Sequence, residues 1–132
     1  GINLQSSLGG TALMMAAAHQ GHVQVVETLL RHGAEINLQD SGGCTALMFA
    51  ANQGYERVVD LLLRHGAEIN LQAIDGYTAL TSAAHYGHPV VVLQLLRAGA
   101  DMALRTAAGE TALQIAKEKG HTECVAAVKT YL

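Results

Sequence analysis

The stretch from Thr45 to Tyr77 reads TALMFAANQGYERVVDLLLRHGAEINLQAIDGY, and similar stretches precede and follow it. Its opening phrase, Thr-Ala-Leu, occurs at Thr11, Thr45, Thr78 and Thr111, with spacings of 34, 33 and 33 residues. Gly-Ala followed by an acidic residue occurs at Gly33, Gly66 and Gly99, and a further set of glycines comprises Gly21, Gly54, Gly87 and Gly120. Three interleaved sets with one period indicate a chain built from copies of one supersecondary unit.

Each copy is predicted to form two helices followed by a loop. Thr45 can cap the first helix because its hydroxyl can accept from the free amides of the first turn. Residues 46–53 are mostly helix formers, and Gly54 can end the helix in the left-handed conformation without steric cost. A second helix is expected from about Glu56 to His65. The polar segment after it turns at Asp75-Gly76.

Further features of the repeats are typical of one known family. They are a mid-repeat glycine followed by His or Tyr, the Val-Val…Leu-Leu run between Val58 and Leu63, and Gly-Ala-Glu-Ile-Asn at Gly33 and Gly66. With these residues, almost the whole chain resembles the ankyrin repeat. The resemblance implies an all-α repeat solenoid of about four stacked repeats, in which antiparallel helix pairs carry hairpin loops at right angles.

The repeat boundaries predict a single ankyrin repeat domain over 1–132. Its parts are a partial loop (1–10), three repeats (11–44, 45–77, 78–110) and a C-terminal capping repeat (111–132). The last unit lacks Gly-Ala-Glu and is weaker in leucine, as terminal repeats commonly are. The first unit has no such cap, so we expect an exposed N-terminal stacking face that includes Leu8, Met14 and Met15.

Two local details carry their own predictions. Thr11 to Gly21 spans ten steps, against nine in the other repeats, and the surplus residue lies within 15–19. It predicts a π-bulge or a widened helix end, with a tolerated insertion near a helix terminus as the alternative. In the last repeat, Thr111 and Gln114 have the spacing of a capping box.

Composition limits the possible partners and compartments. Half of the 132 residues are apolar, 14% are charged and the formal net charge is −3, so the chain is neither disordered nor a basic nucleic-acid binder. No apolar run approaches the roughly 18 residues of a membrane span, and no membrane partner is expected. Cys44 and Cys124 lie in different repeats and are predicted to be unpaired thiols, which favours the cytoplasm or nucleus.

The sequence contains no recognisable catalytic or cofactor-binding motif. It has no phosphate-binding loop, no dinucleotide-binding glycine pattern and no nucleophile elbow. Five of the seven histidines follow the repeat pattern, and no cation flanks Cys44 to activate its thiol. We therefore predict no enzyme activity, no cofactor and no metal site.

The resemblance implies that a partner docks on the concave face, formed by the loop tips and the exposed positions of the first helices. There the repeats differ from one another while their framework does not. The predicted partner-binding residues are Ser41, Asn52, Gln53, Ile74, Asp75, Tyr77, His85 and Tyr86. Tyrosine is enriched among binding hot spots, so the third repeat is favoured. The prediction is a non-catalytic scaffold for protein–protein interaction that binds a protein or peptide; the alternative is that these side chains only solvate the surface.

Two further interpretations stay open. The chain, as a segment of an ankyrin array or an artificial one, could be a structural or self-associating scaffold without a natural ligand. We expect a monomer, with a dimer through the N-terminal stacking face as the alternative. The resemblance also implies possible hydroxylation by an asparaginyl hydroxylase at Asn37 and Asn70, which follow Leu29 and Leu62 by eight residues.

Overall fold

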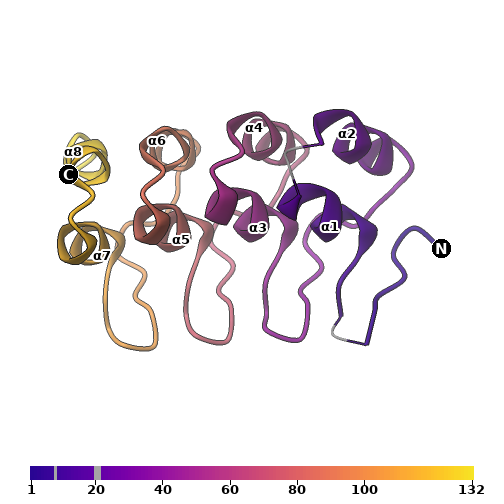
Figure 1. The fold of residues 1–132 in the computed structure, drawn as a ribbon, viewed down its shortest axis with the longest axis horizontal. Helices are drawn as coiled ribbons and strands as arrows, with labels where there is room; N and C mark the ends of the chain where they lie inside the picture. Colours follow the sequence, from indigo (N-terminus) through magenta and orange to yellow (C-terminus); the bar gives the residue numbers. More distant parts are fainter. Residues whose placement is uncertain (8, 20–21) are drawn as a thin grey trace.

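A computed structural model describes residues 1–7, 9–19 and 22–132, and these residues form eight helices and no strand. The helices are arranged as four stacked pairs joined by loops (Figure 1). Their bounds are α1 Ala12–Ala18, α2 Val23–Arg31, α3 Ala46–Gln53, α4 Glu56–Arg64, α5 Ala79–Tyr86, α6 Pro89–Arg97, α7 Ala112–Lys119 and α8 Thr122–Lys129. The predicted all-α repeat solenoid is confirmed.

The eight helices lie in two rows (Figure 1). The first helices of the pairs, α1, α3, α5 and α7, form the row next to the loops, and α2, α4, α6 and α8 form the other. Alanines line the stacking surfaces of the first row, and Ala50, Ala51, Ala83 and Ala84 are fully buried. Small side chains let neighbouring helices approach closely, so the core is continuous along the stack.

Each first helix begins at its threonine, as predicted. The Thr45 hydroxyl accepts the backbone N–H of Met48 at 3.3 Å, and Thr11, Thr78 and Thr111 cap in the same way. The capping box between Thr111 and Gln114 is also confirmed. The second helices have no side-chain cap, and α6 instead has proline in its first turn, where no backbone donor is needed.

The loops are hairpins that project on the same side of the helical rows (Figure 1). In the third one, the N–H of Ala73 donates to the carbonyl of Tyr77 at 2.8 Å, and the predicted turn falls at Asp75-Gly76. Neighbouring hairpins are also joined, since the Ala107 N–H donates to the Asp75 carbonyl at 2.7 Å. These bonds hold the loop tips in a row beside the first helices.

The first repeat departs from two expectations. Residues 12–18 are regular α-helix without a π-bulge. Helix α1 is one residue shorter than α3, and His19, which follows it, is extended. The predicted stop at Gly21 lies outside the described residues, as does Leu8. Met14 is only 3% exposed and belongs to the core, whereas Met15 is 63% exposed. The expected stacking face therefore includes Met15 and excludes Met14, which packs beneath the helix row.

None of the helices in the described part of the chain is long and apolar enough to cross a membrane.

Candidate interaction site

A cavity of about 250 Å³ lies between α3, α5 and the hairpin that precedes α5. Five of the eight predicted partner-binding residues line it: Asn52, Asp75, Tyr77, His85 and Tyr86. The structure places the other three outside it, all exposed to solvent: Ser41, Gln53 and Ile74. Ile74 is 81% exposed at the hairpin tip. The predicted residues therefore comprise five that line one cavity and three that are exposed outside it.

Three rings form one wall of this cavity. The Tyr77 hydroxyl lies 3.1 Å from Nδ1 of His85, and the two rings meet edge to face with centroids 5.7 Å apart. The rings of His85 and Tyr86 are tilted, with centroids 4.6 Å apart. Tyr86 is 56% exposed, so it forms the rim, while Tyr77 and His85 are half-buried. The hydrogen bond fixes the orientation of the inner two rings before any partner arrives.

The floor of the cavity consists of residues that the sequence analysis did not assign to the site. Met48, Ala73 and Ser82 are buried there, and the half-buried Cys44 lies at one side. Met48 is the residue that follows its Thr-Ala-Leu phrase, a place that varies between the repeats. The signal that could have found it is the period, because the first helices stack in register.

One buried polar atom in the cavity wall has no hydrogen-bond partner, namely Oδ1 of Asn52. The backbone of the same residue is held in place, because its carbonyl lies 2.8 Å from Nε2 of His88 in the next repeat. A buried carbonyl oxygen without a donor costs about 1–3 kcal/mol. Less than 1 Å² of this atom is accessible to solvent, so a donor from the cavity reaches it only when the side chain turns toward the cavity.

The charged side chains that act on the cavity residues are mostly acidic. The pKa of the Cys44 thiol is raised, first by partial burial and then by the carboxylates of Asp40 and Asp75. Partial burial also raises the pKa of Tyr77, followed by the charges of Glu110 and Asp75. A carboxylate raises the pKa of a neighbouring thiol or phenol because it disfavours a second negative charge.

The imidazole of His85 is the titrating group in the wall. Its pKa is lowered, first by partial burial and then by Lys119 and His121, while Glu118 acts in the opposite direction. A lowered pKa keeps the ring neutral at pH 7. The wall therefore adds no positive charge of its own to the acidic surroundings.

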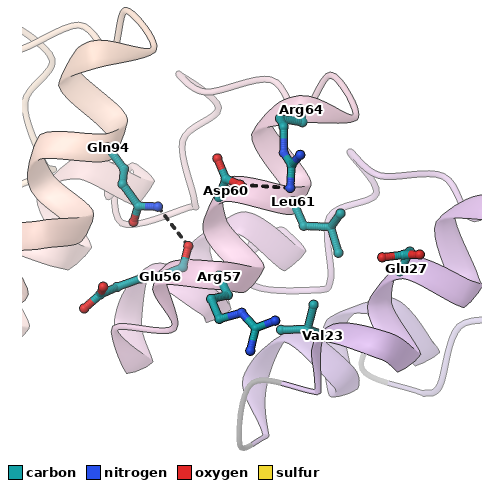
Figure 2. A pocket seen from close by; sticks show the side chains of 8 residues that line it. All are labelled: Val23, Glu27, Glu56, Arg57, Asp60, Leu61, Arg64 and Gln94. Atoms are coloured by element: carbon teal, nitrogen blue, oxygen red, sulfur yellow. Dashed lines mark hydrogen bonds and ion pairs between the residues drawn. The ribbon is translucent and has the colours of Figure 1, made fainter.

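A second cavity, of about 430 Å³, lies on the opposite row of helices between α2 and α4 (Figure 2). Val23 and Leu61 line it together with Glu27, Glu56, Arg57, Asp60, Arg64 and Gln94. Asp60 and Arg64 pair with each other at 3.0 Å on an exposed surface. Three carboxylates and two guanidinium groups nearly balance, so this cavity selects no particular ligand charge.

Asn37 and Asn70 link neighbouring repeats. Oδ1 of Asn37 accepts the N–H of Glu68 at 2.8 Å, and Oδ1 of Asn70 accepts the N–H of Asp101 at 2.9 Å. Each side chain therefore already has a structural partner in the next repeat. Hydroxylation at either residue stays a prediction, which mass spectrometry of the native protein tests by the presence or absence of one added oxygen.

The N-terminal stacking face exposes apolar side chains on several elements. Leu4, Met15 and Val25 are all exposed, and of α2 only Val26 is buried, whereas α4 buries Val58 among others. Among the described helices, α2 packs against α1 and α4. Pairing through this face stays a prediction.

Within the described residues, no group of three or more His, Cys, Asp or Glu side chains is arranged to hold a metal ion.

Two family models match the chain: "Ankyrin repeats (3 copies)" over residues 1–73 and "Ankyrin repeats (many copies)" over residues 62–116. A search among curated proteins finds no match.

Proposed function

The chain belongs to the ankyrin repeat family, and we propose that it is a non-catalytic module that binds a protein or peptide on its concave face. The loop tips and first helices form this face, and the cavity between α3 and α5 is its centre. Members of this family are generally protein–protein interaction modules. The two free thiols favour action in a reducing compartment, the cytoplasm or nucleus.

The observation that carries the proposal is the ring cluster of Tyr77, His85 and Tyr86 at the mouth of a cavity, beside the exposed Ile74. A prearranged aromatic wall supplies contact area at a low cost in conformational entropy. Exposed apolar groups beside a cavity are typical of a binding surface. Hot-spot residues commonly fill such a central position, with polar groups around them.

Partner capture from a cell extract tests the proposal. The test variant is Ile74→Ala with Tyr86→Ala, because both side chains are exposed and their removal should leave the fold intact. The control is Val90→Ala with Tyr131→Ala, which removes exposed side chains that do not line the cavity. We expect capture by the wild type and the control, and a loss of about thirtyfold or more in the test variant, which is the effect of a single hot spot. A partner held equally by both variants, with circular dichroism showing both folded, would refute the concave-face site.

A further inference from the structure

We propose that the cavity between α3 and α5 accepts a basic side chain of an extended partner segment, arginine in preference to lysine. The inference rests on the proposed function, because it names the chemistry of the group that the concave face takes. Four features of the cavity support it: its size, its acceptor atoms, its charge and its rings.

The size of the cavity favours one side chain over a small-molecule ligand. Pockets for drug-sized molecules enclose about 300–1,000 Å³, and this cavity encloses about 250 Å³. Its mouth lies beside hairpins whose tips stand in a row, so an extended segment can lie across them and insert one side chain.

The polar atoms of the cavity require a donor. Oδ1 of Asn52 is buried without a partner, and Asp75 presents a carboxylate at the rim. Asp75 is held in place twice: its Oδ1 accepts the N–H of Tyr77 at 3.0 Å, and its carbonyl accepts the N–H of Ala107 at 2.7 Å. An incoming guanidinium group carries five N–H donors in a fixed fork, so it can bind the exposed carboxylate of Asp75 and also donate to Asn52 when that side chain turns toward the cavity.

The charge around the cavity favours a cation. Asp40 and Asp75 act on Cys44, and Glu110 and Glu118 act on Tyr77. Among the described residues that line the cavity, none is lysine or arginine. Lys119 on α7 acts on His85, but the four carboxylates outnumber it, so the charge balance around the cavity is negative. Complementary charge steers a partner and fixes its register.

The rings favour arginine over lysine. Guanidinium groups stack on aromatic faces and are more weakly hydrated than ammonium groups, so their transfer into a half-buried site costs less. Tyr86 offers an exposed ring, and the neutral imidazole of His85 adds no repulsion at pH 7. A lysine would retain the charge attraction but lose the stacking and the fork.

Titration with defined peptides tests the inference. The probes are acetyl-Gly-Ala-Xaa-Ala-Gly-amide with arginine, lysine, citrulline or glutamate as Xaa, followed by ¹H–¹⁵N NMR on the whole chain. Peptide concentrations up to about 10 mM detect dissociation constants in the millimolar range. Citrulline has the shape of arginine without its charge and is the decisive control.

The expected result is saturable shifts at the side-chain amide of Asn52 and at Tyr77 and Tyr86, strongest with arginine and weaker with lysine. Asp75→Asn keeps the acceptor for the Tyr77 N–H but removes the charge, and it should weaken arginine binding roughly two- to fivefold, the range for exposed ion pairs. Asp60→Asn, which removes an exposed carboxylate on α4, should change nothing. Equal shifts with citrulline and arginine, or no saturable shift with arginine, would overturn the inference.

The two proposals fail in different ways. If capture depends on Ile74 and Tyr86 but the arginine peptide gives no shift at Asn52, the concave face binds a partner without a basic anchor. If the arginine peptide binds but capture does not depend on Ile74 and Tyr86, the partner contacts lie elsewhere and the concave-face proposal fails.

Discussion

Three glycines that end first helices offer a test of how neighbouring repeats are joined. Gly54, Gly87 and Gly120 have φ values of 75°, 76° and 73°, so alanine at any of them meets the same backbone strain. Their surroundings differ. A Cβ at Gly54 would lie 2.5 Å from Nδ1 of His88, and one at Gly87 would lie 2.8 Å from the ring of His121, but one at Gly120 would meet nothing within 4 Å.

The expected loss of stability has two parts. All three substitutions share the backbone strain, and only Gly54 and Gly87 add a clash with a histidine ring. A non-glycine residue in the left-handed region costs roughly 1–2 kcal/mol, and the restriction of the unfolded chain returns about 0.4–1 kcal/mol. Alanine at Gly120 should therefore destabilise by about 1 kcal/mol. At Gly87 the ring of His121 must move, and its 3.0 Å hydrogen bond to the carbonyl of His85 is lost, which adds about 0.5–1.5 kcal/mol. The total at Gly54 or Gly87 is therefore about 1.5–2.5 kcal/mol.

The assay is urea unfolding followed by circular dichroism, with the m-values compared so that a loss of cooperativity is recognised. A double-mutant cycle of Gly87→Ala with His121→Ala separates the two parts. Once the histidine is absent, the cost of alanine at Gly87 should fall to that at Gly120. Equal costs at all three glycines, or no coupling between Gly87 and His121, would refute the idea that the histidine joins the repeats.

Four further outcomes are expected. Thr81→Val should cost about 1–3 kcal/mol in urea unfolding, because it leaves the buried N–H of Thr78, now bonded at 2.7 Å, without an acceptor. Because the pKa of His85 is lowered, the unfolded chain binds its proton more readily. The free energy of unfolding should therefore be highest above the unfolded-state pKa of about 6.5 and decrease as the pH falls toward the lower pKa of the folded state. His85→Gln should reduce this dependence of stability on pH. Burial raises the pKa of both thiols, so a thiol reagent at neutral pH should modify Cys44 more slowly than free cysteine, and the buried Cys124 only on unfolding. Light scattering should give a monomer across micromolar concentrations, and a mass that rises with concentration would favour pairing through the N-terminal stacking face.

Features that depend on one repeat alone could be read from the sequence. The threonine caps, the left-handed Gly54 and the span of α3 were predicted correctly, and α4 ends one residue before the expected His65. Such features depend on the conformation of adjacent residues, which residue type largely determines. The same reasoning missed the capping box between Thr78 and Thr81, because the second hydroxyl replaces a longer side chain that the motif normally requires.

Hydrogen bonds between repeats could not be predicted from the sequence in the same way. Nε2 of Gln39 donates to the carbonyl of Gly43 in its own hairpin at 2.9 Å and to that of Gln72 in the next at 3.3 Å. His88 reaches the carbonyl of Asn52, 36 residues earlier. The period predicts that such positions lie side by side, but only the geometry of the stack decides which side chains are long enough to bond.

The location of the cavity follows from three positions that vary while the framework repeats. In successive repeats these positions hold Cys44, Asn52 and Gln53, then Tyr77, His85 and Tyr86, then Glu110, Glu118 and Lys119. The family resemblance implied the concave face, and the variation selected these positions on it, because framework residues at the same period are held constant by packing. The cavity itself required two neighbouring sets of unequal size: Cys44 and Asn52 are small enough to leave space, and the rings of Tyr77, His85 and Tyr86 form the wall. If the concave face binds as proposed, the contrast between adjacent repeats shapes the site, and a substitution in the second repeat should alter binding by the third.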